Sequence, residues 1–346
     1  MNKKIAVLFL ALIFSLTGCT QLRVTAPIET PEAAVLNAVA ELPSIGVVVS
    51  QYDDGFLSFV RSHMVRLAEG RAHLTLLDSR NSQSKQLAQI DTMISKGVQA
   101  LAVNLVAADS AQQVIEKVQA AGLPVVFFGV EPDAGVLASY DRAWYVGTTP
   151  GEAERILGGI VARSWRAHPA YDRNGDGIVQ LFLMGPGSHD EVIRALGLAG
   201  LRTEVLAANN EIATQPQAAA QIKSWLEDHS EEVEFVVTTN DYLALGAVDA
   251  LMTAGFYNSE GATMPVVGME SIPQTLEVLR QGQMQGSVLK DALGMGAAVT
   301  ELSCNVALGY PPLQDTVWAL DDTKAVRIPY VAVTADSMAE AMQAFS

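Results

Sequence analysis

From residue 44 onward, short apolar runs alternate with longer segments whose apolar positions recur at helical spacing. The short runs are rich in β-branched residues and typical of buried strands, whereas the longer segments are typical of amphipathic helices. Strands that alternate with helices indicate a parallel sheet covered by helices on both faces. The expected strands are residues 45–50, 100–106, 123–130, 178–185, 234–240, 264–270 and 326–334.

The alternation restarts after residue 150, which predicts a second α/β unit of similar size. We therefore expect an α/β protein with two doubly wound lobes. Ligands of such sheets bind at the carboxyl ends of the strands, so polar residues at strand ends are the candidates for a site. The sequence has no nucleophile elbow, phosphate loop or His/Cys cluster, so we expect a binding protein and no enzyme.

The first 18 residues have the features of a signal peptide, with Lys3 and Lys4 followed by the apolar run IAVLFLALIFSL. This run is too short to span a membrane as a helix. It leads into LTGC, which resembles the lipobox of bacterial lipoproteins, and this resemblance implies cleavage before Cys19 and its lipidation. The alternative is an ordinary signal peptide that contains a Cys. Residues 19–43 have the Pro-rich composition of a flexible tether.

Charge and cysteine content exclude several classes. The formal net charge is −16, so the chain is not expected to bind nucleic acid through its phosphates. Anionic membrane surfaces would repel it too, and a lipid is therefore a plausible means of attachment. After processing, Cys304 is the remaining thiol, which excludes a disulfide framework.

Oxygen-bearing side chains recur at every second position in YDRNGDGIVQ, at Asp172, Asn174 and Asp176. Gly177 permits a sharp turn after them, and Gln180 adds another oxygen. This spacing matches the first part of an EF-hand loop, whose hard oxygen ligands suit Ca²⁺. The alternative is a solvated Asp/Asn/Gly turn, which is a common structure.

Several strings, among them YDDGF, KGVQALAVNLV, SYDRAWYVGT and TNDYLALGAVDAL, resemble the periplasmic galactose/glucose-binding proteins, the type I solute receptors of ATP-driven (ABC) sugar importers. The similarity runs from about residue 45 to 335. It implies two Rossmann-like lobes joined by a three-segment hinge, which close on one sugar. The expected N-terminal lobe is residues 44–127 plus 290–325, and the expected C-terminal lobe is 128–289 plus 326–346.

The resemblance also implies one structural calcium ion in the C-terminal lobe. In the family, a loop supplies five oxygens and a Glu on a distant strand supplies a bidentate carboxylate. The ligands implied here are Asp172, Asn174, Asp176, the backbone carbonyl of Ile178, Gln180 and Glu234.

A sugar offers hydroxyls at its rim and apolar C–H faces, so its site needs carboxylates, amides, cations and aromatic rings. The resemblance places such residues at strand ends and in GPGSHDEVIR. Taken alone, Asp54 is equally consistent with a helix N-cap, Phe56 with core packing, and Asp190 with Arg194 as a surface helix pair. The implied ligand-binding residues are Asp54, Phe56, Asn104, His189, Asp190, Arg194, Asn240, Glu270 and Lys290.

Four positions depart from the family pattern. Ser50 replaces a Tyr, Ala213 falls where a Trp forms the second stacking wall, Glu270 replaces an Asp, and Lys290 replaces an Asn. Glu270 and Lys290 are candidates to pair with each other, or Lys290 to meet an anionic ligand. Because of these departures, the resemblance does not determine which sugar is bound.

The resemblance implies a receptor held by lipid on the periplasmic side of a bacterial membrane. It would bind a monosaccharide, D-glucose or D-galactose first, and deliver it to the membrane permease of an ABC importer. The sequence does not decide whether a chemoreceptor is a second partner. The alternatives are a receptor for a modified sugar or a signalling furanose, or, from another class, an enzyme on the same fold.

Overall fold

The computed structural model describes residues 41–258 and 261–339. The expected signal peptide, Cys19 and nearly all of the tether lie outside these residues. Within them, no helix combines the length and the apolar character that crossing a membrane requires.

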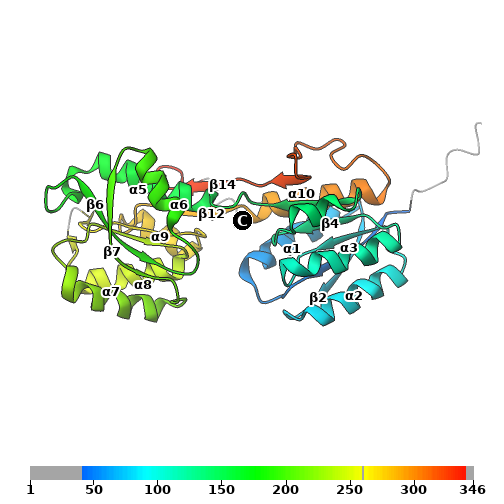
Figure 1. The fold of residues 1–346 in the computed structure, drawn as a ribbon, viewed down its shortest axis with the longest axis horizontal. Helices are drawn as coiled ribbons and strands as arrows, with labels where there is room; N and C mark the ends of the chain where they lie inside the picture. The colour runs from blue at the N-terminus through cyan, green and yellow to red at the C-terminus, as the bar shows by residue number, and fades with distance from the viewer. Residues whose placement is uncertain (1–40, 259–260, 340–346) are drawn as a thin grey trace, which may run out of the picture. The chain divides into compact units, whose positions relative to one another are not determined.

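The first lobe, residues 44–147 and 292–327, is built on a parallel sheet with the strand order β13-β5-β4-β3-β1-β2 (Figure 1). Its strands are β1 (Ser44–Val49), β2 (His73–Asp78), β3 (Ala100–Val103), β4 (Val125–Phe128), β5 (Ala143–Gly147) and β13 (Ala325–Arg327). The helices around it are α1 (Gly55–Ala68), α2 (Gln83–Ser95), α3 (Ala111–Ala120), α4 (Ala134–Ala138) and α10 (Ala292–Ala307).

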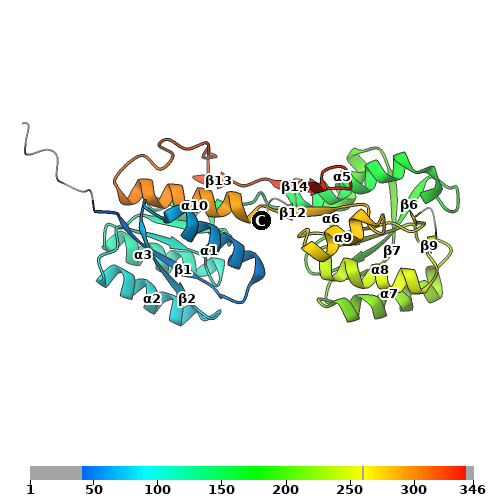
Figure 2. The same ribbon diagram turned by 180° about the vertical axis from the view of Figure 1, so that it is seen from behind.

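The second lobe, residues 152–290 and 330–339, has a parallel sheet with the order β11-β8-β6-β7, seen from the other side in Figure 2. The strands of this sheet are β6 (Ile178–Met184), β7 (Arg202–Asn209), β8 (Phe235–Thr238) and β11 (Val266–Val267). Separately, β12 (Ser287–Lys290) pairs antiparallel with β14 (Tyr330–Val333), and β9 (Tyr257–Asn258) forms a short hairpin with β10 (Gly261–Ala262). Its helices are α5 (Glu152–Ala167), α6 (Asp190–Leu198), α7 (Gln215–His229), α8 (Asp241–Thr253) and α9 (Pro273–Arg280).

The chain passes between the lobes three times, after β5, after β12 and after β13. This agrees with the expected three-segment hinge, but two expected boundaries are wrong. The boundary at 127/128 fails because β5 pairs with β4 in the first sheet, so the chain leaves this lobe only after Gly147. The boundary at 325/326 fails because β13 pairs with β5, and the expected single strand 326–334 is divided at Pro329, which has no N–H for a sheet.

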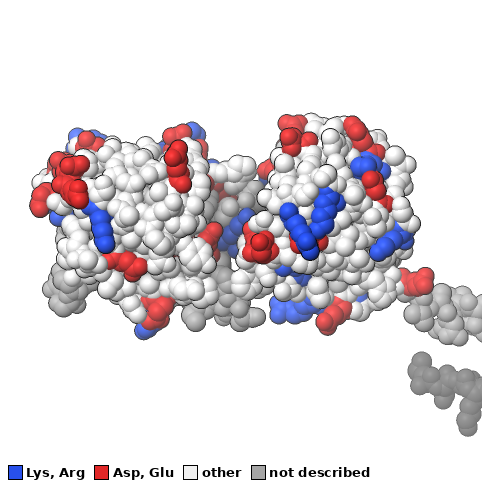
Figure 3. Space-filling view, turned by 90° about the horizontal axis from the view of Figure 1, so that it is seen from below, with Lys and Arg blue, Asp and Glu red and all other residues white. Residues whose placement is uncertain are grey.

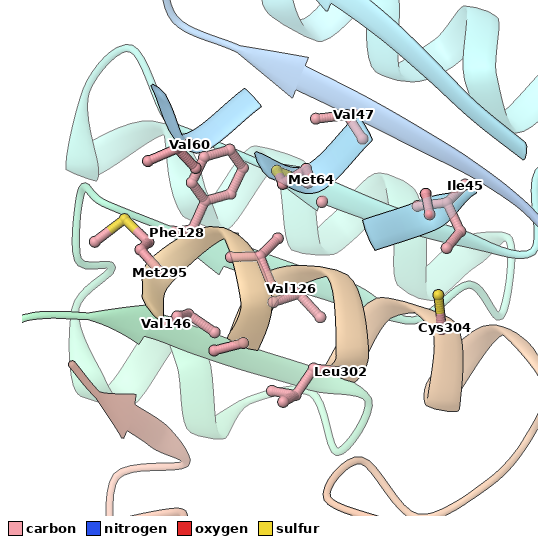
Figure 4. Packing of buried hydrophobic residues seen from close by; sticks show 14 of the residues in the cluster. Ile45, Val47, Val60, Met64, Val126, Phe128, Val146, Met295, Leu302 and Cys304 are labelled. Carbon is pink, nitrogen blue, oxygen red and sulfur yellow. The ribbon is translucent and has the colours of Figure 1, made fainter. Parts of the chain in front are cut away.

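Alternation along the strands builds a core on each face of each sheet. Val47 of β1 joins a cluster with α1 and α10, whereas its neighbour Val48 faces a cluster with α2 and α3. Figure 4 shows the first of these clusters, in which Met64 of α1 and Met295 of α10 lie over strand residues. The second sheet is covered likewise, by α7, α8 and α9 on one face and by α5 and α6 on the other.

Charged residues of the described chain lie mostly at the surface, with Glu234 and Asp241 as buried exceptions. On the described part of the face in Figure 3, Lys and Arg side chains lie scattered among Asp and Glu side chains. Cys304 is buried in α10 as a free thiol.

Helices α5 and α6 pack closely because Gly158 has no side chain. A Cβ at this position would lie 2.6 Å from the Ala195 Cβ and 2.8 Å from the backbone oxygen of Val192. The adjacent Gly159 faces open space, with no atom within 4 Å of a Cβ built there. Substituting Ala at each of these two glycines therefore distinguishes the effect of helix packing from the effect of helix propensity.

We predict that Gly158→Ala destabilises the protein by roughly 1–3 kcal/mol, because backbone atoms of α6 must move. Gly159→Ala, its matched control, should stabilise by up to about 1 kcal/mol, because Ala restricts the unfolded chain and favours helix. Urea unfolding of both variants provides the measurement. Equal effects of the two substitutions would show that the close approach of the helices is not tight.

Candidate functional site

Four segments at the carboxyl ends of strands meet around a cavity of about 530 Å³. They are the start of α1 after β1, the start of α8 after β8, the loop 270–274 after β11, and residues 289–292 after β12. Parallel sheets place ligands at such strand ends because the helix N-termini and the connecting loops present polar groups there. The cavity draws residues from both lobes.

Asp54 and Phe56 line the cavity from α1. Asp54 is also the N-cap of this helix, since its Oδ1 accepts a hydrogen bond of 2.7 Å from the Leu57 N–H. The helix-cap reading and the binding reading of Asp54 are therefore compatible, because capping uses one carboxylate oxygen and leaves the other for a ligand.

Lys290 lies in the same cavity, with its Nζ 4.2 Å from the centre of the Phe56 ring. Burial lowers the pKa of its ammonium, while the charges of Asp54 and Glu270 raise it. None of the ion pairs among the described residues involves Lys290. The considered Glu270–Lys290 ion pair is thus not formed, and the ammonium covers the aromatic face instead.

Glu270 lines the cavity from the opposite lobe. Burial raises the pKa of its carboxyl, and the positive charge of Lys290 lowers it. Two carboxylates and one ammonium thus line the cavity, a set that can accept hydrogen bonds from hydroxyl groups and donate hydrogen bonds to oxygens.

The two strand-end asparagines have structural partners. Asn104 is buried, its Oδ1 accepts a 2.6 Å hydrogen bond from the Ser50 hydroxyl, and its Nδ2 donates to the Phe128 carbonyl at 2.9 Å. Asn240 is the N-cap of α8 and accepts from the Leu243 N–H. Neither belongs to the described lining of the cavity.

The start of α6 also lies outside that lining. His189 is buried, with its Nε2 3.4 Å from the Met184 carbonyl, and burial lowers the pKa of its ring. Asp190 is exposed, and Arg194 pairs with Glu191 at 3.4 Å while two-thirds of its side chain stays exposed. The roles of these residues in ligand binding therefore stay predictions.

Two aromatic side chains of the cavity had not been expected. Phe59 lies one helical turn after Phe56, and Tyr242 follows the strand-end Asn240 by two residues. The spacing to these neighbours is the signal that could have indicated them. Ala213, which falls at the second stacking wall of the resemblance, is exposed next to the capping box of α7 and does not line the cavity.

The loop 172–180 is closed by hydrogen bonds among its own oxygens and amides. The Asp172 Oδ2 accepts from the Gly177 N–H, and the Asp176 carboxylate accepts from the Ile178 N–H and from the Gln180 side chain at 2.9 Å. Asn174 Oδ1 accepts from the Asp176 N–H at 3.0 Å. Hydrogen bonds therefore link the expected loop ligands to one another and to the loop backbone.

Glu234 directly precedes β8, lies beside this loop and is fully buried. Its two oxygens accept from the backbone N–H groups of Arg173 and Gln180. Burial raises the pKa of its carboxyl to about 7. Within the loop, Asp172 Oδ1 and Gln180 Oε1 are buried without a hydrogen-bond partner.

Two buried oxygens without a donor fit a bound cation, because leaving such atoms unpaired costs free energy. The carboxylates have not gathered around a common centre, however: no group of three or more His, Cys, Asp or Glu side chains in the described chain has a metal-binding arrangement. The oxygen ligands are chemically suited to a calcium ion, but in this structure they are arranged as a hydrogen-bonded loop.

Comparison with known proteins supports this fold. Residues 45–311 match the periplasmic binding protein domain family. A D-galactose/methyl-galactoside binding periplasmic protein of Haemophilus influenzae is 37% identical over 307 residues, which cover 86% of this chain and 91% of that protein. A ribose import binding protein of Bacillus subtilis is 23% identical, over 89% of this chain and 94% of its own length.

Among solved structures, an ABC transporter solute binding protein from Bacillus halodurans with bound myo-inositol is 25% identical to this chain. The match has a TM-score of 0.65 and covers 87% of this chain and 98% of that one. The family match spans most of the described residues and includes both lobes and the cavity. This chain belongs to the periplasmic binding protein family.

Proposed function

We propose that this protein is a lipid-anchored receptor outside the cytoplasm, which binds a monosaccharide and delivers it to the permease of an ABC importer. The observation that carries the proposal is the cavity at the strand ends, lined by Asp54, Phe56, Glu270 and Lys290, in a chain 37% identical to a D-galactose/methyl-galactoside binding protein. D-Galactose and D-glucose are the first candidates for the ligand. A binding role without catalysis agrees with the names of these relatives.

Each polar group of the cavity has a defined task in this proposal. The free oxygen of Asp54 and the carboxylate of Glu270 accept hydrogen bonds from sugar hydroxyls, and the Lys290 ammonium donates a hydrogen bond to a hydroxyl oxygen. Asp54 and Glu270 belong to different lobes, so a sugar held by both favours a closed arrangement over an open one.

Two observations favour the second candidate, a different small polyol or modified sugar. The Lys290 ammonium lies over the Phe56 ring, and Ala213 provides no second aromatic wall. A pyranose that stacks on Phe56 must displace this cation first. The named relatives bind D-galactose, ribose or myo-inositol, so a panel of neutral sugars and polyols decides between the candidates.

We predict that calorimetry detects binding of D-galactose or D-glucose, and that Asp54→Asn weakens it by about tenfold or more. Asn preserves the helix cap but removes a charge-assisted hydrogen bond, which contributes roughly 1.5–3 kcal/mol. Asp133→Asn is the matched control, because Asp133 caps α4 by the same type of contact away from the cavity.

The outcomes separate the two candidates. Binding of myo-inositol or D-ribose but of neither hexose supports the second candidate. An affinity that is unchanged in Asp54→Asn, or reduced equally in Asp133→Asn, would place the ligand elsewhere.

We propose further that the loop 172–180 and Glu234 hold a structural calcium ion. The ligands are Asp172, Asn174, Asp176, the Ile178 carbonyl, Gln180 and Glu234. The buried unpaired oxygens of Asp172 and Gln180 support the proposal. Bound calcium would tie this loop, which leads into β6, to Glu234 directly before β8.

We predict that EDTA lowers the melting temperature of the wild type and that excess Ca²⁺ restores it. A ligand that binds only the native state stabilises it by about 2.7 kcal/mol at a hundredfold excess over Kd. In Asp172→Asn, which keeps the size of the side chain but loses its charge, the calcium-dependent part should shrink or vanish. Identical melting of the wild type in EDTA and in Ca²⁺ would refute the calcium site.

The lipid anchor is proposed on Cys19, which lies outside the described residues. The support is the LTGC sequence directly after the apolar run. Stable attachment needs two or more acyl chains, which a diacylated Cys provides.

We predict that the wild type enters the detergent phase on Triton X-114 partitioning and that Cys19→Ala stays in the aqueous phase. Cys304→Ala is the control, because this buried cysteine is the other thiol of the chain. If Cys19→Ala still partitions with detergent, another element attaches the protein.

A further inference from the structure

The loop between β11 and α9 brings Glu270 into the cavity through an unusual backbone conformation. The φ angles of Glu270 and Ser271 are 108° and 54°, in the region that residues with a side chain rarely adopt. Such conformations persist only where the surroundings hold them. The contacts that hold this loop therefore decide where Glu270 lies.

Three successive backbone N–H groups of the loop are anchored on the second lobe. Glu270 donates to the Val288 carbonyl at 2.7 Å, and Ser271 donates to the Ser287 hydroxyl at 3.1 Å. Ile272 donates to Oδ2 of Asp241 at 3.0 Å.

The Asp241 carboxylate lies at the centre of these anchors. It is fully buried in the first turn of α8, and its Oδ1 accepts a 2.8 Å hydrogen bond from the Ser287 hydroxyl. The same Oδ1 is close to Gly268, where a Cβ would come within 2.3 Å of it. The backbone N–H of Asp241 also acts on the Glu270 carboxyl, whose pKa it lowers. One residue thus contacts both the backbone and the side chain of the loop.

Asp241 itself does not belong to the described lining of the cavity, whereas Tyr242, Glu270 and Ile272 do. We propose that Asp241 is a positioning residue, whose carboxylate holds the loop 268–272 in the conformation that presents Glu270 to the ligand. This role concerns the sugar site proposed above, but its first test needs no ligand.

Protonation of Asp241 makes the stability of its contacts with the loop depend on pH. The charged group that faces Asp241 in the described chain is Glu270, while β12 contributes the Ser287 hydroxyl and α9 the Thr275 hydroxyl. Burial raises the pKa of Asp241 to about 7. A carboxyl whose pKa is raised in the folded state stabilises that state at low pH, and this contribution is lost as the pH rises toward 7. The loop should therefore open more readily across that range.

Amide hydrogen exchange of the peptide that contains residues 268–276 tests the proposal. In Asp241→Ala we expect exchange about tenfold faster or more, because local opening no longer breaks the Asp241 contacts. Asp241→Asn should restore protection, since its Oδ1 can accept from Ile272 and its Nδ2 can donate to Ser287. After correction for intrinsic base catalysis, the decline of protection with rising pH should be smaller in Asp241→Asn than in the wild type. Adding Glu270→Gln to Asp241→Asn should remove the pH dependence that remains.

Asp249→Asn is the control, because Asp249 lies on the exposed side of the same helix. Wild-type exchange in Asp241→Ala, or equal effects of Asp241→Asn and Asp241→Ala, would overturn the proposal. If Asp241→Ala does not fold, Ser287→Ala removes the partner of the Ser271 N–H and must speed exchange of the same peptide. If D-galactose or D-glucose binds the wild type, Asp241→Ala should weaken it and Asp241→Asn should not; if neither binds, exchange still decides the role of Asp241.

Discussion

Parallel pairing sends the carboxyl ends of all strands of a lobe to one edge of its sheet, and the binding cavity depends on this constraint. Residues distant in the sequence reach the cavity from the segments that follow parallel strands: Asp54 after β1, Tyr242 after β8 and Glu270 after β11. Lys290 joins them from the end of β12, which pairs antiparallel with β14. Each lobe buries both faces of its sheet under helices. The strand ends are therefore the places where polar groups can face a ligand.

The cavity and the loop 268–272 with its anchor Asp241 concentrate buried charge, which costs stability. Burial opposes the charges of Asp241, Glu270 and Lys290 and shifts the pKa of each toward its neutral form. Glu270 also adopts a left-handed backbone. Such costs are typical of functional sites, where a ligand gains from groups that are held in place before it arrives. The hydrogen bonds of Asp241 and Ser287 offset part of this cost within the second lobe.

The alternation of strands and helices could be read from the sequence because it follows from burial on both faces of a parallel sheet. The resemblance to the galactose/glucose-binding proteins implied Asp54, Phe56, Glu270 and Lys290 as site residues, and all four line the cavity. The placement of the Lys290 ammonium over Phe56 instead of beside Glu270 could not be predicted, because it depends on side-chain packing across two lobes. Likewise, β5 was missed because its aromatic residues follow a polar turn, and its role appears only through pairing with β4.

The central claim is that the cavity between Asp54 and Glu270 is the place where this receptor holds its sugar. A crystal structure of the protein grown with D-galactose or D-glucose, whichever binds, tests it most directly. The account predicts sugar density inside the cavity, with hydroxyl groups in hydrogen-bond contact with Asp54 and Glu270 and the Lys290 ammonium moved from the Phe56 ring or bonded to a sugar oxygen. Sugar bound at a site that includes none of these residues would contradict it.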